Sequence, residues 1–293
     1  MEVLMLVGVP GSGKSTYANE MAEKGWHVIS SDAIRAELSN EEDQSQNSLV
    51  FDILRERVYQ VLSAGKDVIV DACNINRKAR KSIIHVVKRI KGAEIRAMVF
   101  NVFPEVCKER NRSRARKVPE EVIDKMIAKF EVPCRWEGFN GVYCHEEAYE
   151  YEKSVDAVLK MRGFNQYNPH HNLDLYEHCM YCALILTKRN KPNLYYAGLF
   201  HDFGKQFCQT FDTKGIAHYY NHASISAYYA LCYFSSIYYA SLICYHMWCY
   251  DEPRWNSLKN KAKDDPVFLA DLWELHKADE DAHKPLEEVE PMA

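Results

Sequence analysis

The sequence has little of several features that would place it in a special class of protein. Its net charge over 293 residues is only −4, so there is no overall basic excess, and any nucleic-acid binding would need a local patch. No apolar run approaches the roughly 20 residues that a membrane span needs. Because the chain opens directly on a strand-like segment, we expect no cleavable targeting segment, no membrane association and a cytoplasmic location.

The ten cysteines also lack a recognisable pattern. They are irregularly spaced, which in a chain without a secretory segment predicts buried, reduced thiols rather than disulfides. Cys179 and Cys182 form a CxxC, but no second pair follows at the spacing of a zinc site. We therefore interpret both as core residues of the helix that carries His178.

The most informative stretch lies at the start of the chain. An apolar segment of strand character, residues 3–9, leads into a glycine-rich turn that fits G-x-x-x-x-G-K-[ST] at every fixed position. Glycines can adopt positive φ, which lets backbone N–H groups surround a phosphate at the positive end of the following helix. The motif predicts an ATP or GTP site with Mg²⁺, formed by Gly8, Pro10, Gly11, Ser12, Gly13, Lys14, Ser15 and Thr16.

Strand and helix patterns alternate after this motif. Strands are predicted at residues 27–30, 67–71 and 95–100, and a helix at residues 46–64 that Gly65 ends. This alternation favours an α/β domain with a parallel sheet. Asp32 and Asp71 follow the ends of two strands, the edge where such sheets bind ligands. Asp71 is a candidate Walker B carboxylate that holds Mg²⁺ through water, whereas Ser31 or Asp32 has the alternative role of capping a helix.

A basic segment, residues 107–119, follows the last predicted core strand of this half. Arg110 and Arg114 are four residues apart, so we expect them to share a helix face. A solvated surface is the simplest interpretation of such a run. Its position is also that of a lid over the phosphates, where guanidinium groups stabilise the charge that develops in phosphoryl transfer.

Four motifs in this order, GVPGSGKST, SSDAIR, VIVDACNINRKAR and ERNRSRARKVPEEVIDKM, resemble the 5′-hydroxyl polynucleotide kinase domain of the phage T4 polynucleotide kinase type. The resemblance covers about residues 1–135. It implies that Asp32 is the general base for the 5′-hydroxyl and that Arg35 holds the acceptor phosphate. It also implies a lid arginine on the ATP phosphates, for which Arg110, Arg114 and Arg116 are candidates.

The residues alone point to the same chemistry. A carboxylate at a strand end facing the γ-phosphate is what transfer to a hydroxyl requires, because the attacking oxygen needs a base. Small-molecule kinases share this geometry, so they remain an alternative at this point.

The second half has a different pattern, with helices separated by short breaks. We place the boundary at residue 150, giving an α/β P-loop kinase domain at 1–150 and an all-α domain at 151–293. The tyrosine-rich stretch at residues 219–245 has helical spacing and is interpreted as core. Histidines and acids recur within apolar helices, where each buried polar group needs a partner or a metal. They are His178, His201, Asp202, His222, His246 and Asp279.

This order, H…HD…H…H…D, resembles the HD phosphohydrolase superfamily over about residues 165–285. The resemblance implies that His178, His201, Asp202 and Asp279 hold one metal and that His222 and His246 complete a second site, with Asp202 bridging. Mixed nitrogen and oxygen ligands favour Mn²⁺, Co²⁺, Ni²⁺, Fe²⁺ or Zn²⁺ over Mg²⁺, and such ions activate water for attack on a phosphate. Lys205 and His171 are candidate contacts to that phosphate.

Bacterial HD–Pnk proteins, which join these two activities with the HD domain first, are similar to this chain with the domain order reversed. The combination implies a bifunctional enzyme that heals RNA or DNA ends, such as those of a cleaved tRNA, before a separate RNA ligase seals them. Two alternatives stay open: a nucleoside or nucleotide kinase fused to a nucleotide phosphohydrolase, and an ATP-gated binding module with a degenerate HD fold.

Overall fold

The structure is a computed structural model that describes residues 1–38, 46–114, 116–146, 151–168 and 172–283. The chain divides into two compact units, one of residues 1–127 and 133–146 and the other of residues 128–132 and 147–293. The main division therefore lies close to residue 150, while a short segment after the last helix of the first unit belongs to the second. Among the described helices, none has the length and apolar character to cross a membrane.

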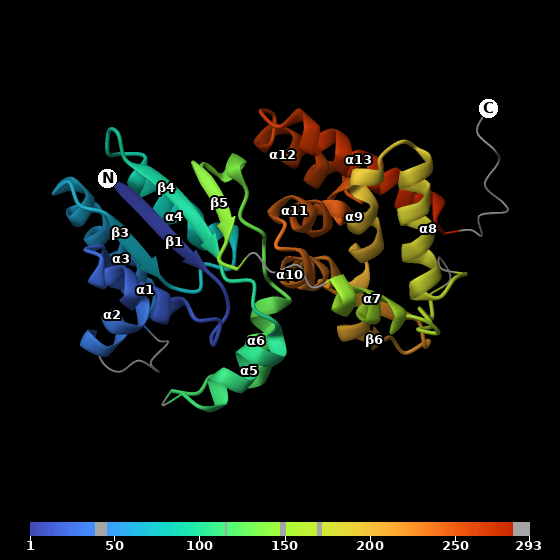
Figure 1. Cartoon of the computed structure of the whole chain (residues 1–293), viewed down its shortest axis with the longest axis horizontal. Helices are drawn as coiled ribbons and strands as arrows, with labels where there is room; N and C mark the ends of the chain where they lie inside the picture. Colours follow the sequence, from blue (N-terminus) through green and yellow to red (C-terminus); the bar gives the residue numbers. More distant parts are fainter. Residues whose placement is uncertain (39–45, 115, 147–150, 169–171, 284–293) are drawn as a thin grey trace. The chain divides into compact units, whose positions relative to one another are not determined.

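The first unit is built on a five-stranded sheet with the order β2-β3-β1-β4-β5, in which every pairing is parallel (Figure 1). The predicted parallel sheet is thereby confirmed. Its strands are β1 (Glu2–Val7), β2 (His27–Ser30), β3 (Val68–Asp71), β4 (Glu94–Val99) and β5 (Gly141–Cys144). The last strand was missed, because Gly138, Asn140 and Gly141 suggested only turns.

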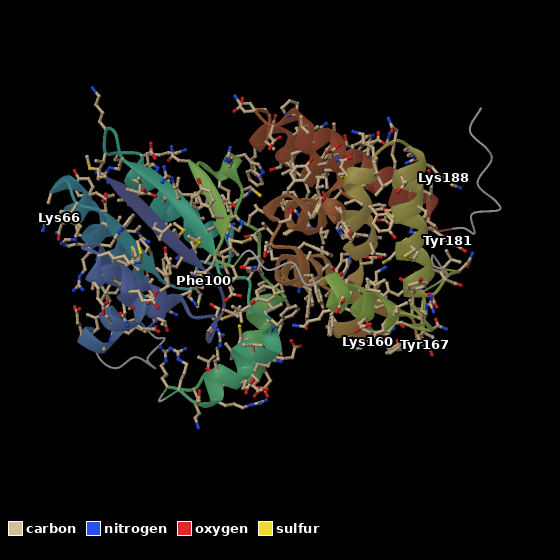
Figure 2. All side chains as sticks on the ribbon, viewed as in Figure 1. Lys66, Phe100, Lys160, Tyr167, Tyr181 and Lys188 are labelled. Atoms are coloured by element: carbon tan, nitrogen blue, oxygen red, sulfur yellow. The ribbon has the colours of Figure 1, made fainter. Side chains whose placement is uncertain are left out.

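Helices connect these strands, as parallel pairing requires. They are α1 (Lys14–Glu23), α2 (Ser31–Leu38), α3 (Asn47–Ser63), α4 (Arg77–Val87), α5 (Pro104–Arg112) and α6 (Glu120–Ile127), with a short 3₁₀ turn η1 (Arg135–Glu137). Leu4 and Leu6 of β1 pack with Ala18 of α1 and with Phe100, which is labelled in Figure 2. Val3 and Met5 alternate to the other face, so the central strand is buried on both sides.

The second unit is mainly helical, as predicted. Its helices are α7 (Tyr151–Leu159), α8 (Leu175–Lys188), α9 (Tyr195–Phe200), α10 (His222–Phe234), α11 (Ile237–Tyr245), α12 (Glu252–Lys261) and α13 (Pro266–Asp281), with 3₁₀ turns η2 (Pro192–Leu194), η3 (Phe203–Phe207) and η4 (His246–Tyr250). The helix α8 begins with a reciprocal cap between Asp174 and Glu177. Its core face includes Cys179 and Cys182, both fully buried.

Two expectations about this half need correction. The domain is not entirely α-helical, because β6 (Gln209–Phe211) and β7 (Ala217–Tyr219) form an antiparallel hairpin between η3 and α10. Most of the tyrosine-rich stretch lies in the core, including Tyr228 and Tyr245, but Tyr238 and Tyr239 are half-buried and Tyr220 at its start is 68% exposed. Tyr220 directly follows β7 of the hairpin.

Candidate functional site

The glycine-rich turn forms the centre of the first candidate site. Gly11 and Gly13 have φ of +83° and +98°, a conformation that other residues adopt only under strain. A Cβ on Gly11 would lie 2.2 Å from the carbonyl oxygen of Cys107 in α5. Glycine is therefore required here both by the turn and by the close approach of a neighbouring helix.

Lys14 and Ser15 open α1 directly after this turn. Lys14 Nζ donates to the Val9 carbonyl oxygen at 2.9 Å, and Ser15 Oγ donates to Asp71 Oδ2 at 2.8 Å. Burial raises the pKa of Asp71 and outweighs the hydrogen bond from Ser15 and the charge of Lys14, which both lower it. The Ser15 hydroxyl and the Asp71 carboxylate, the two groups expected to hold Mg²⁺, therefore meet at the end of β3.

A cavity of about 520 Å³ lies over the turn. Its lining combines turn residues Gly11 to Tyr17 with Arg110 and Arg114 of the basic segment. Backbone donors, a buried lysine and two guanidinium groups around one space fit a triphosphate with its metal. Gly8 and Pro10 lie at the entrance to the turn and are not among the described lining residues of this cavity.

The basic segment begins in α5 and does not continue as a helix beyond Arg112. Helix α5 ends at Arg112, so Arg114 follows the helix, and the expectation that Arg110 and Arg114 share a helix face is wrong. The side chain of Asn111 binds the backbone of Val118 twice, at 2.7 and 3.0 Å. This clamp holds Val118 against the last turn of α5, and Arg110 and Arg114 both reach the same cavity.

Asp32 lies in the first turn of α2 between two arginines. Arg35 Nη1 is 2.6 Å and Arg116 Nη1 is 2.9 Å from Asp32 Oδ1. The alternative that Ser31 or Asp32 merely caps the helix is wrong, because Ser30 Oγ accepts the hydrogen bond from the Ala33 amide. The link between Asp32 and the basic segment was missed, since nothing in their spacing along the chain indicates it.

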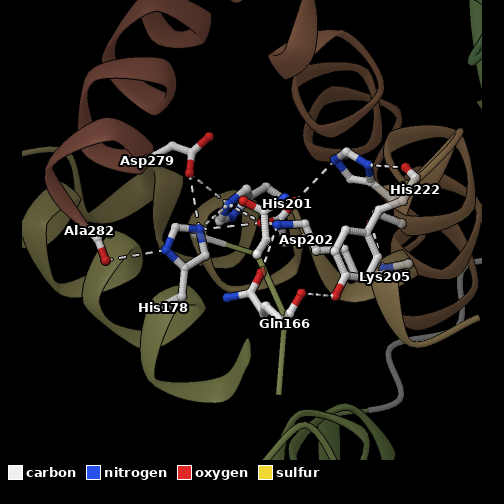
Figure 3. A network of polar contacts seen from close by, with 12 residues as sticks. Gln166, His178, His201, Asp202, Lys205, His222, Asp279 and Ala282 are labelled. Carbon is white, nitrogen blue, oxygen red and sulfur yellow. Dashed lines mark hydrogen bonds and ion pairs between the residues drawn. The ribbon is translucent and has the colours of Figure 1, made fainter. Parts of the chain in front are cut away.

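The second candidate site is a buried cluster of histidines and aspartates from five parts of the second unit. Ligand atoms of His178, His201, Asp202 and Asp279 lie within 4.8 Å of one another, and so do those of Asp202, His222 and His246. Figure 3 shows five of these side chains lying close together: His178, His201, Asp202, His222 and Asp279. All six predicted residues therefore meet, whereas His171 lies outside the described residues.

Asp202 connects the two groups through different oxygens. Its Oδ2 is 3.3 Å from Nε2 of His178 and 3.4 Å from Nε2 of His201. Its Oδ1 is 3.1 Å from Nε2 of His222 and 3.7 Å from Nε2 of His246. One carboxylate thus faces two pairs of imidazoles, as a bridging ligand would.

The hydrogen bonds of the imidazoles assign their tautomers. In each of His178, His201, His222 and His246, Nδ1 contacts a backbone carbonyl oxygen at 2.7 to 3.2 Å. A carbonyl only accepts, so Nδ1 of each ring carries a hydrogen, and in the neutral ring Nε2 presents a lone pair. Within the described part of the chain, the buried Nε2 atoms of His222 and His246 have no hydrogen-bond partner. Lone pairs directed at carboxylates fit metal ions and are otherwise costly.

The electrostatics of the cluster favour bound positive charge. Burial lowers the pKa of His201, but Asp202 and Asp279 outweigh it and raise that pKa well above its usual range. Burial alone would raise the pKa of Asp202, yet Lys205 and His201 hold it well below the ordinary value. The carboxylates are therefore ionised, and they create a negative potential that suits cations.

Two further residues support the cluster, and neither was predicted. Tyr250 donates its hydroxyl hydrogen to Asp279 Oδ2 at 2.9 Å. Gln166 Oε1 accepts from Lys205 Nζ at 2.8 Å, and the same Nζ lies 2.6 Å from Asp202.

Burial raises the pKa of Cys179 to about 12, which keeps this thiol protonated as expected of a core residue.

Comparisons with known proteins find similarity over part of this chain. Residues 3–133 match the family model described as an AAA domain. The chain is 28% identical over 180 residues, 57% of its length, to "Transcription factor bHLH140" of Arabidopsis thaliana. It is 26% identical over 146 residues, 44% of its length, to "Putative bifunctional polynucleotide kinase/RNA ligase" of Autographa californica nuclear polyhedrosis virus.

These relatives are much longer proteins, of which the chain spans 18% and 21%. A solved structure, "Structure of the Pnkp1/Rnl/Hen1 RNA repair complex", matches with a TM-score of 0.40 and 24% identity, covering 44% of this chain and 43% of the other. The parallel sheet, the glycine-rich turn and the match of residues 3–133 to the family model agree that the first unit has a P-loop kinase fold.

Proposed function

We propose that the chain is a bifunctional nucleic-acid end-healing enzyme. Its first unit would phosphorylate a 5′-hydroxyl end, and its second unit would remove a 2′,3′-cyclic, 2′- or 3′-phosphate. The observation that carries the proposal is the six-residue cluster around Asp202, in which two buried Nε2 atoms have no hydrogen-bond partner among the residues that the structure describes. A kinase domain alone does not explain such a cluster, whereas a second, metal-dependent phosphate chemistry does.

In the kinase unit, Asp32 is the proposed general base for the attacking hydroxyl. Arg35 lies beside it and is positioned to hold the phosphate next to that hydroxyl, with its other nitrogen anchored on Asn47 at 2.9 Å. When bound, MgATP supplies the phosphoryl group. Lys14, Arg110 and Arg114 surround the cavity and would neutralise the charge that develops on transfer.

In the second unit, the chain's own residues hold and orient the phosphate end. His178, His201, Asp202 and Asp279 would hold one ion, and Asp202, His222 and His246 the other. Bound ions of this kind activate water and neutralise phosphate oxygens. Lys205 is buried beside Asp202 and lines the adjacent cavity, so it is positioned to contact the phosphate.

The polynucleotide substrate is supported by the viral relative, whose printed name joins a polynucleotide kinase to an RNA ligase. By that likeness, a separate ligase would seal the ends that this chain prepares, with RNA as the favoured substrate. The net charge of −4 favours a second candidate, a nucleoside or nucleotide kinase fused to a nucleotide phosphohydrolase, because polynucleotide-binding proteins are more often basic.

End-group analysis separates these possibilities. The chain is incubated with ATP, Mg²⁺ and Mn²⁺ and an RNA oligonucleotide bearing a 5′-hydroxyl and a 2′,3′-cyclic phosphate, in parallel with the corresponding nucleoside and cyclic nucleotide. The proposal expects a new 5′-phosphate and loss of the cyclic phosphate on the oligonucleotide. Reaction of the nucleoside and cyclic nucleotide alone would support the second candidate, and reaction of none would contradict both.

A further inference from the structure

A second cavity, of about 380 Å³, extends from the candidate metal ligands to the β6–β7 hairpin. Asp202, His222 and Asp279 line its inner part together with Lys205. His218, Tyr219 and Tyr220, from β7 and the residue after it, line its outer part. The hairpin therefore forms a wall of the space through which a phosphate would reach the cluster.

The outer wall presents aromatic rings to solvent. The rings of His218 and Tyr220 are stacked, with centroids 5.7 Å apart and planes 10° from parallel. Tyr220 is 68% exposed, unlike Tyr228 and Tyr245, which are buried in the helical core. An exposed pair of parallel rings beside a phosphate site is a surface on which a nucleobase can stack.

The hairpin is held in place by hydrogen bonds on both sides of its turn. Asp212 Oδ1 accepts from the backbone amides of Lys214 and Ile216 at 2.8 and 3.0 Å. The other carboxylate oxygen lies 3.5 Å from Nε2 of His218. The rings are thus preorganised, which lowers the entropy cost of binding a ligand on them.

The same hairpin is connected to the lysine beside the metal cluster. Tyr219 donates its hydroxyl hydrogen to the Gln166 carbonyl oxygen at 2.6 Å, while the side chain of Gln166 accepts from Lys205. Lys205 Nζ also lies 5.3 Å from the centroid of the Tyr219 ring. One set of contacts therefore fixes the stacked rings relative to the cation that would contact a phosphate.

We propose that His218 and Tyr220 form a stacking platform for a base of a single-stranded nucleic-acid end whose terminal phosphate lies at the metal cluster. The proposal rests on the phosphoesterase function above and names its substrate class as base-bearing single strands. Stacking on flat rings accepts any base, so the platform would select single strands without reading their sequence.

The test is direct binding to the full chain with Mn²⁺, measured by fluorescence anisotropy. The probe is a short RNA with a 3′-phosphate and a 5′-fluorophore, which blocks the kinase acceptor end, and a second probe is abasic at its last two positions. For the base-bearing probe, Tyr220→Ala should raise Kd about 5- to 100-fold. The change for the abasic probe should be less than about twofold, and Tyr220→Trp should stay near wild type.

Phe211→Ala is the matched control, because Phe211 is an aromatic of the same hairpin that is 54% exposed and packs on Tyr167, which is labelled in Figure 2. Phe211 is not among the described residues that line the cavity, so its variant should bind both probes like wild type.

Equal Kd values for Tyr220→Ala and wild type on the base-bearing probe would overturn the platform, as would equal losses on both probes. Phosphate release from the same RNA, without the fluorophore, is measured in parallel. If binding changes as expected but no metal-dependent phosphate release occurs, the stacking platform is supported and the phosphoesterase function is contradicted.

Discussion

Asp202 Oδ1 lies 3.1 Å from Nε2 of His222, yet among the described residues this Nε2 has no hydrogen-bond partner. His222 donates its Nδ1 hydrogen to the Tyr219 carbonyl oxygen at 2.7 Å, so in the neutral ring a lone pair on Nε2 faces an ionised carboxylate. The same relationship recurs at His246, whose Nδ1 contacts the Ile243 carbonyl oxygen at the same distance. This repeated mismatch is the strongest physical reason to place cations beside Asp202.

Removal of metal should destabilise the second unit. At an ion concentration of about 100 Kd, binding stabilises the folded state by about 2.7 kcal/mol, so chelation should lower Tm by roughly 5 to 10 °C for a unit of this size. Calorimetry before and after dialysis against a chelator checks this, with metal content measured by mass spectrometry. His222→Ala should lose metal, whereas the control His85→Ala, an exposed residue of α4, should keep it. Unchanged metal content in His222→Ala would contradict the assignment.

Replacement of Asp32 should abolish kinase turnover while leaving ATP binding intact. A general base contributes roughly 10²- to 10⁴-fold to rate, and it makes no large contact with ATP in the ground state. Asp32→Ala and Asp32→Asn should therefore lose kcat without a matching change in ATP affinity by calorimetry. Asp52→Asn is the control, because Asp52 pairs with Arg55 at the same i,i+3 spacing on an exposed face of α3. Near wild-type turnover in Asp32→Ala would reduce Asp32 to an ion-pair partner of Arg35 and Arg116.

Arg114 and Arg116, which follow α5, should affect the KM values of different substrates. Arg114 lines the nucleotide cavity, so Arg114→Ala should raise the KM for ATP, lower kcat, or both. Arg114→Lys should restore little activity, because the ammonium is a point charge and lacks the planar, forked donors of a guanidinium group. Arg116 contacts Asp32, so Arg116→Ala should change the KM of the hydroxyl acceptor more than that of ATP. Steady-state kinetics, with ATP and the hydroxyl acceptor varied in turn, give the two KM values for each variant. Wild-type ATP kinetics in Arg114→Ala would transfer the lid role to Arg110 or Arg116.

A methyl group on Gly11 should disrupt the nucleotide site. Gly11→Ala combines a φ of +83° with a contact of 2.2 Å to the Cys107 carbonyl oxygen, so the turn or α5 must move. ATP affinity should fall by more than about tenfold, because the cradle of backbone amides depends on this turn. Gly25→Ala has a similar φ of +93° but nothing within 4 Å of the added atom. That control should lose about 1 to 3 kcal/mol of stability without a change in ATP affinity. Equal ATP affinity in both variants would contradict the requirement for glycine at position 11.

Local patterns were enough to predict four of the five strands of the sheet and the glycine-rich turn. The glycine-rich turn is contiguous in sequence, and strand-terminal acids such as Asp71 meet it because parallel strands share one carboxyl edge. The histidine cluster was assigned by resemblance, since its members lie on helices up to 101 positions apart, from His178 to Asp279. Spacing alone does not bring such residues together.

Features that depend on tertiary packing were not predictable. The contact of Arg116 with Asp32 joins a loop to α2 across 84 positions, and the bond from Tyr250 to Asp279 joins η4 to α13. The hairpin of β6 and β7 has only three residues in each strand, too few for a clear alternation of polar and apolar residues. Tyr220 was consequently grouped with the buried tyrosines that follow it.

The central claim is that one chain carries two independent phosphate chemistries, and the most direct test measures both activities in two variants. Lys14→Ala should erase 5′-kinase activity and leave the phosphoesterase intact, because Lys14 belongs to the nucleotide site alone. Asp202→Ala should erase the phosphoesterase and leave the kinase intact, because Asp202 faces both metal positions. Mg²⁺ alone should support the kinase, whereas the phosphoesterase should need Mn²⁺, Co²⁺ or Ni²⁺. Loss of both activities in either folded variant would contradict the account.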